Sequence, residues 1–202
     1  MSKIRLTKNE LKKQKEALKR FERYLPMLLL KKRQIRLETT KIHQAIKSVS
    51  QEIENFRNEV IHWVDVFAED ANIFEILKLE SIQTDQGNVA GVDLPVFLGV
   101  KFKQQPYDLM AVPLWVDKAI ESLKEMITYK ARLLVYRKQL DILKEELRIA
   151  GQRVNLFEKV KIPEAKENIR ILQIYLGEIR TAEVVRGKIA KAKIEKRKLV
   201  NA

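Results

Sequence analysis

The first half of the chain carries apolar residues at a regular seven-residue spacing. Counting sevens from Leu11, and adding the position three residues after each, gives 17 positions, of which 14 are apolar. A chain that is 46% hydrophobic would place about eight apolar residues there by chance. Thr7 and Glu10, just before the run, form a capping box that marks a helix start. The pattern predicts one long helix with a coiled-coil stripe. The stripe positions are Leu11, Gln14, Leu18, Phe21, Leu25, Leu28, Lys32, Ile35, Thr39, Ile42, Ile46, Val49, Ile53, Phe56, Val60, Trp63 and Phe67.

Pro26 lies inside this run, where its ring nitrogen cannot donate a hydrogen bond to the carbonyl of Glu22. The heptad pattern resumes in phase on both sides of it. We therefore expect a continuous helix with a kink, and a short break is the alternative.

A second apolar run begins after Pro113 and alternates spacings of three and four. Beyond Pro163 the stripe continues, displaced by one residue, which predicts a local change in the supercoil. The positions before the displacement are Met126, Tyr129, Leu133, Tyr136, Leu140, Leu143, Leu147, Ala150, Val154 and Phe157, and those after it are Ala165, Ile169, Leu172, Leu176 and Ile179.

Between the two runs, three of the six Gly and three of the five Pro residues fall within residues 87–113. Residues 76–83 and 96–102 read as strands, and residues 84–88 supply turn residues. Alternation is imperfect in both strands, so the segment is a small hairpin or an irregular lobe. The sequence predicts a mainly α fold: a long antiparallel two-helix coiled coil, with helices in residues 1–71 and 114–202 and an insert over 72–113.

The net charge of +13 is concentrated at the two ends of the chain. Residues 1–36 hold 13 Lys or Arg against three Glu, and residues 186–202 hold seven against one. Antiparallel helices would bring both ends to one tip. Such a tip could be a solvated charge run, an arm that binds nucleic-acid phosphates, or a segment held in an acidic or polar socket of another protein. Candidate contact residues at the tip are Arg5, Lys8, Lys12, Lys13, Arg186, Lys188 and Lys191.

The residues expected of an enzyme are missing from the sequence. It has no Cys, no Gly-rich phosphate loop and no dinucleotide-binding spacing, and its two histidines, His43 and His62, stand 19 residues apart. We expect no catalytic site, no metal and no cofactor. No signal-peptide core and no run of about 18 apolar residues occurs, so we expect a soluble protein that is neither secreted nor membrane-spanning.

Several segments together resemble the D subunit of the V-type and A-type rotary ATPases. Arg153-Val154-Asn155-Leu156-Phe157-Glu158, followed by Ile162-Pro163, is similar to that family's Arg-Val-Asn-Ala-Leu-Glu stretch and its Ile-Pro. The chain departs from the family where Tyr24 and Arg33 replace an expected Gly and Asp, and Pro26 is unusual. Further matches at the two ends are Thr7, Lys8, Glu10, Leu11, Leu18, Leu28, Lys31, Leu176, Glu178, Glu183, Arg186 and Lys188.

The resemblance implies a non-catalytic central-stalk rotor subunit, without a cofactor, that couples ATP hydrolysis or synthesis to ion translocation by rotation. Its basic tip would enter the ring of catalytic and nucleotide-binding subunits, its insert would hold a small stalk partner, and a funnel-shaped subunit would link it to the membrane rotor. The family would place it in the cytoplasm, peripheral to the membrane. Shaft residues carried over from the motif are Arg153, Val154, Asn155, Glu158 and Pro163. A prefoldin-like chaperone subunit and a basic nucleic-acid-binding arm are the alternatives.

Overall fold

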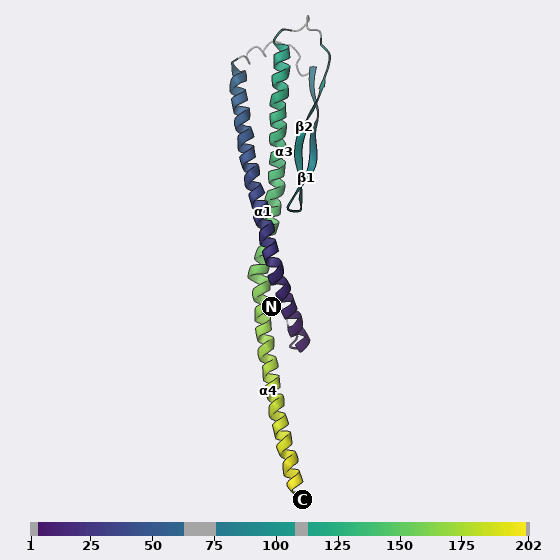
Figure 1. The fold of residues 1–202 in the computed structure, drawn as a ribbon, viewed down its shortest axis with the longest axis vertical. Helices are drawn as coiled ribbons and strands as arrows, with labels where there is room; N and C mark the ends of the chain where they lie inside the picture. The colour runs from purple at the N-terminus through teal and green to yellow at the C-terminus, as the bar shows by residue number, and fades with distance from the viewer. Residues whose placement is uncertain (1–3, 63–75, 108–112, 201–202) are drawn as a thin grey trace. The chain divides into compact units, whose positions relative to one another are not determined.

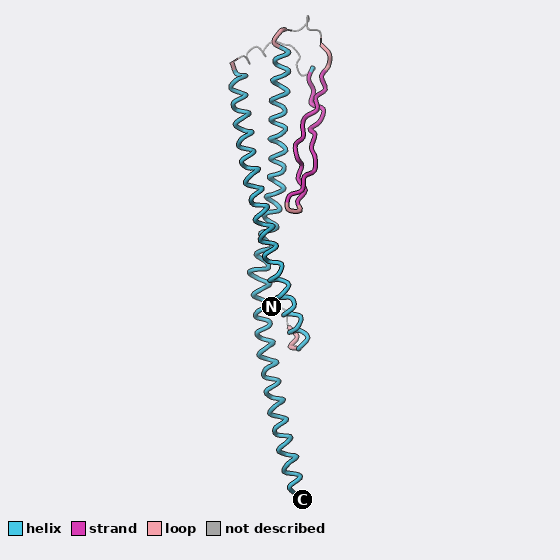
Figure 2. The backbone as a smooth tube through the Cα atoms, viewed as in Figure 1, coloured by secondary structure: helices cyan, strands magenta, loops and turns pink. Residues whose placement is uncertain are grey.

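A computed structural model describes residues 4–62, 76–107 and 113–200. Of these, 78% are helical, which confirms a mainly helical chain with a small antiparallel sheet (Figure 2). Trp63 and Phe67, and the expected boundary between residues 71 and 72, lie outside the described residues. In chain order the elements are α1 (Lys8–Ile61), β1 (Leu77–Val89), β2 (Val92–Gln104), α3 (Val116–Asn155), the π-helix η2 (Leu156–Lys161) and α4 (Ile162–Val200) (Figure 1).

The chain divides into two compact units, one of residues 1–30 with 151–202 and one of residues 31–150. Helix α1 contributes to both and runs without a break through Pro26, so continuity was predicted correctly. Each of the 15 stripe positions from Leu11 to Val60 is buried or half-buried. Ile35 and Val49 are the most enclosed of them, at 0% and 4% exposure. The heptad count therefore identified the covered face of α1.

In the first unit, the start of α1 packs against η2 and α4. The ring of Phe21 meets that of Phe157 edge-on, with centroids 5.3 Å apart, a geometry that favours aromatic pairs. Val154, Ala165 and Leu172 are almost fully buried. Thr7 Oγ1 accepts a hydrogen bond from the Glu10 backbone N–H at 3.2 Å, as expected for a helix cap.

The π-helix η2 is the physical cause of the one-residue displacement in the second apolar run. In a π-helix each N–H bonds to the carbonyl five residues back, so one turn holds an extra residue. The Ile162 N–H accordingly donates to the carbonyl of Phe157. After that turn Ala165, Ile169 and Leu172 again lie on the covered face. The sequence indicated a slip, and the structure shows how the helix absorbs it.

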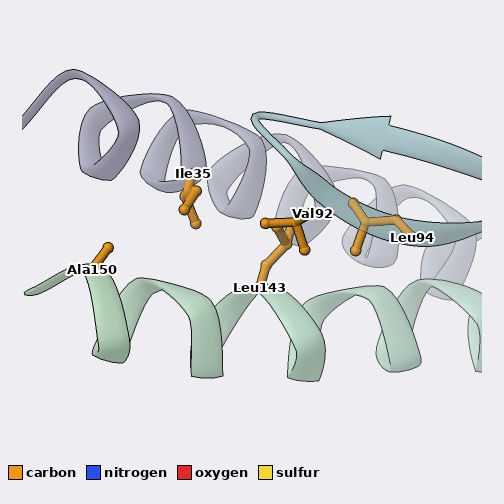
Figure 3. Close-up of a cluster of buried hydrophobic side chains, with 5 residues drawn as sticks. All are labelled: Ile35, Val92, Leu94, Leu143 and Ala150. Atoms are coloured by element: carbon orange, nitrogen blue, oxygen red, sulfur yellow. The ribbon is translucent and has the colours of Figure 1, made fainter. Parts of the chain in front are cut away.

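In the second unit, α3 packs against both α1 and the hairpin, so its covered surface is wider than one stripe. Figure 1 shows β1 and β2 lying alongside α3. One buried cluster joins Ile35 of α1 to Val92 and Leu94 of β2 and to Leu143 and Ala150 of α3 (Figure 3). A second cluster, at the start of α3, joins Leu77, Val116, Ala119 and Ile120.

The expected turn at residues 84–88 is wrong, because that segment is part of β1. The turn comes later, at Ala90 and Gly91, whose φ angles of 53° and 74° are those of a two-residue type I′ hairpin. Gly87 is needed for close packing instead of for a turn. A Cβ built there would stand 2.7 Å from Cγ2 of Val96 on the paired strand.

The strands are also longer than predicted, at 13 residues each. Two irregularities in the register explain the imperfect alternation, one between Leu79 and Ser81 and one between Gln83 and Thr84. At the second, β2 holds Leu98 as an extra residue between the partners of Gln83 and Thr84. Such a bulge changes which face points inward. Phe97 before it and Phe102 beyond it are accordingly both half-buried, although they lie five residues apart.

Candidate functional site

The basic residues near the N-terminus lie on an exposed helix start. Lys8, Lys12 and Lys13 are exposed on the first turns of α1, and the Lys12 ammonium lies 4.0 Å from the Glu16 carboxylate. Arg5, just before the helix, lines an open cleft of about 410 Å³. The other walls of the cleft come from α1 and from Lys161, Glu164 and Asn168. The chain's first basic group therefore lies beside residues 161–168.

The basic residues near the C-terminus lie further along the same unit. Every residue from 177 to 196 of α4 is exposed, including Arg186, Lys188 and Lys191. Arg186 follows Asn168 by 18 residues, which corresponds to roughly 27 Å of helix at the α-helical rise. The structure thus places the two basic groups on the same unit, separated along α4.

Exposed apolar side chains accompany these cations on the last part of α4. Val184, Val185, Ile189 and Ile194 are each between 49% and 57% exposed. A single helix with large apolar groups open to water is typical of a segment that binds another protein. The surface made by residues 177–196 therefore combines cationic and apolar contacts.

The family-motif residues surround η2. Val154 is buried at 2% exposure, while Arg153, Asn155, Glu158 and Pro163 are exposed. Among the motif residues Val154 thus packs inside the unit, and the polar ones face outward from an irregular turn. A π-turn often marks a functional position in a helix, and the displaced stripe was its only signal in the sequence.

Ion pairs on α3 and α4 shift the pKa of two carboxyl groups. Arg170 donates two hydrogen bonds to Glu167, at 2.9 and 2.7 Å, and thereby lowers the pKa of that carboxyl. Arg148 lowers the pKa of Glu145 in the same bidentate way. All four groups are exposed, so these pairs contribute little to folding stability. Between elements of the first unit, Lys166 lies 3.7 Å from Glu22.

Sequence reasoning did not identify Arg132, a residue of α3 that contacts both α1 and β2 in the second unit. The Arg132 guanidinium lies 3.7 Å from Glu52 of α1 and over the rings of Phe97 in β2 and Tyr129 in α3, at 5.8 and 5.9 Å. Such cation–π contacts require the three elements to be in place. Burial, followed by the hydrogen bond to Glu125, raises the pKa of Tyr129. No heptad or motif signalled Arg132, because Glu52 and Phe97 are distant from it in sequence.

Neither a metal-binding cluster nor a membrane-spanning helix occurs among the described residues, 4–62, 76–107 and 113–200. Over these ranges, no group of three or more His, Asp or Glu side chains is placed to hold a metal ion. No helix in that part of the chain is long and apolar enough to cross a bilayer.

Comparison with known proteins gives a consistent match over nearly the whole length. Residues 10–192 match the family described as the ATP synthase D subunit. The chain is 45% identical to the V-type ATP synthase D subunit of Borreliella burgdorferi over 197 residues, 98% of each protein. It is 34% identical to that of Chlamydia caviae, covering 98% of this chain and 96% of the relative. A prefoldin-like subunit and a nucleic-acid arm are therefore set aside, and the chain belongs to the family of ATP synthase D subunits.

Proposed function

We propose that this chain is the rotating shaft of its complex, with residues 177–196 of α4 inserted in the catalytic ring and the hairpin holding a small stalk partner. Family membership makes the chain a stalk subunit of a V-type rotary ATPase. It is thus a structural subunit of an enzyme complex, and we infer that it has no active site of its own.

The exposed end of α4 is the observation that carries the proposal. A helix in which 20 consecutive residues are exposed gains little from packing against the rest of the described chain. Most helical stability in proteins comes from packing against other elements, and Gly177 and Gly187 each weaken this helix by roughly 1 kcal/mol. Neither glycine has a neighbour within 4 Å of a built Cβ, so packing inside the unit does not require it. A surrounding ring would supply the missing contacts.

Arg186, Lys188 and Lys191 would contact the ring together with the exposed apolar residues of the same segment. Arg5, Lys8, Lys12 and Lys13 would form a second contact, nearer the cleft. Charge would aid docking and position the shaft. Gating would come from shape, because a shaft that touches every catalytic site equally would shift none of them. Unequal contacts from one lone helix fit that requirement.

The stripe on α1 and its counterpart on α3 and α4 support antiparallel coiled-coil pairing along the shaft. In the first unit the pairing is supported by Phe21 against Phe157, and in the second by Phe56 against Tyr129, whose ring centroids are 6.0 Å apart. A funnel-shaped subunit would join this shaft to the membrane rotor. We place the chain on the cytoplasmic side, peripheral to the membrane, by analogy with the family alone.

Truncation after Thr181 tests the shaft end. The covered residues up to Leu176 remain, so we expect an intact helical protein but a reassembled complex with reduced ion transport per ATP hydrolysed. Replacing Arg186, Lys188 and Lys191 by Gln is the milder control, since it keeps the shape of the helix. Normal coupling in the truncated complex would show that this segment is a solvated tail.

A further inference from the structure

The two edges of the hairpin differ in how their backbone groups are used. In an antiparallel pair, residues alternate between bonding the partner strand and pointing outward. The ladder bond from the Gln105 N–H to the Ile76 carbonyl, at 2.9 Å, fixes this alternation at the open end of the hairpin. With the observed register, the outward residues of β1 toward the turn are Ile82, Thr84, Gln86 and Asn88.

The outer edge of β2 is already closed. Pro95, the partner of Gln86, has no N–H, and its outward carbonyl accepts a hydrogen bond from Gln139 of α3. Proline and a bulge, here at Leu98, are devices by which proteins prevent an edge from pairing with another strand. The α3 side of the hairpin therefore cannot accept a third strand.

The outer edge of β1 lacks such protection over residues 81–89. That stretch contains no Pro and no Lys, and its one charged residue is Asp85. Among the described residues, none bonds the outward backbone groups of Ile82 or Thr84, while the Asp85 carboxylate accepts the Gln86 N–H at 2.8 Å. Within the described residues an edge of about 20 Å is thus open, and Asp85, its one charged residue, holds one donor with a carboxylate that can rotate away.

We propose that this β1 edge is a docking strand, onto which an extended segment of the small stalk partner adds as a third strand. The inference rests on the proposed function, because it takes the hairpin as the partner's site. Main-chain hydrogen bonds would supply the affinity in this mode, and the small polar side chains of β1 would leave room for the incoming strand. The Asp85 carboxylate accepts the Gln86 N–H until the partner strand displaces it.

Two substitutions with opposite expected effects test the docking strand against the separately purified small stalk subunit. Thr84→Pro removes an outward N–H without removing a ladder bond, and should weaken binding about tenfold or more. Thr84→Val is the matched control and should bind like the wild type. Asp85→Ala frees the Gln86 N–H and should tighten binding a few-fold, an effect that misfolding cannot imitate.

Hydrogen exchange on the full-length chain gives the second measurement. Binding of the small stalk subunit should slow exchange of the outward amides of Ile82 and Thr84, while the ladder amides of Gln83 and Asp85 are protected already in the free chain. Unchanged exchange at the outward amides, with normal binding by Thr84→Pro, would overturn the docking strand and leave the hairpin as the partner's site. If a chain with residues 76–113 replaced by a linker still binds, the proposed placement of the partner itself fails. If the outward amides are already protected from exchange in the free chain, and sedimentation shows that the chain is a dimer, the edge is occupied by a second copy. That result would overturn the proposal.

Discussion

The π-helix η2 should make the chain respond oppositely to losing and to gaining one residue at the same point. Deleting Lys159 removes the extra residue from the wide turn, so residues 156–161 can close into an ordinary α-helix. Inserting an Ala after Lys159 adds a second extra residue, which rotates everything beyond it by about 100°. Both changes are made with Pro163→Ala, because a proline in a regular α-helix clashes with the carbonyl four residues before it.

The expected loss of folding stability is calculated from the residues that the insertion would turn toward water. Leu172 and Ala165 are 0% and 3% exposed, and Ile169 and Leu176 are half-buried. At about 2 kcal/mol for a buried Leu, about 1 for a buried methyl and about 1 for each half-buried side chain, the insertion costs about 5 kcal/mol. For a chain of this size, that corresponds to a fall in melting temperature of roughly 10–20 °C.

Thermal unfolding followed by circular dichroism measures the difference between the two variants. We expect the deletion to melt within a few degrees of the Pro163→Ala parent and the insertion to melt far below it. Amide exchange at Ile169 and Leu172 should remain slow in the deletion variant only. Equal damage from both changes would refute the reasoning, because it would show that the helix holds no extra residue to lose.

Three further predictions concern the hairpin and the surface ion pairs. Ala90→Asn should raise the free energy of unfolding by about 1 kcal/mol in denaturant titrations, because Asn tolerates the positive φ of a type I′ turn better than Ala; a loss of stability would contradict the turn type. Gly87→Ala should destabilise the hairpin through contact with Val96, and adding Val96→Ala should restore most of that loss. Glu145 and Glu167 should titrate below the ordinary 4.5 in carboxyl NMR, and Arg148→Gln and Arg170→Gln should return each to that value. Because folding lowers both pKa values, the small stability they add is present at neutral pH and is lost as pH falls through the lowered values.

The helical part of the fold was predictable because one physical rule determines it. An apolar stripe must be covered, so the heptad positions of α1 from Leu11 to Val60 are the covered ones. The same rule failed for part of α3. Ala131, Val135 and Gln139 are buried although they lie off the predicted stripe, because the hairpin covers a second face of that helix. The apolar stripe of one helix does not show whether a second element packs against another face of that helix.

The hairpin was predictable in kind and not in detail. Residues 84–88 have turn chemistry, but Asp85 and Asn88 use their side chains to bond nearby groups of the extended strand and of the turn that follows. The real turn contains an Ala at positive φ, which residue preference alone disfavours. Ladder hydrogen bonds over two strands of 13 residues outweigh that local cost. Cooperative pairing between strands, unlike helical periodicity, depends on both strands at once.

Packing within the chain and contact with the complex are assigned to different residues. Arg132, Leu143 and Ile35 hold helices and hairpin together, and each contacts groups of its own unit. Within the described residues, the last part of α4 leaves apolar side chains exposed, and the outer edge of β1 leaves backbone groups without a hydrogen bond. A stalk subunit needs both kinds of region, because torque passes only through a body that keeps its shape and through surfaces that fit other subunits. The unsatisfied groups are therefore where changes should alter coupling or assembly before they alter folding.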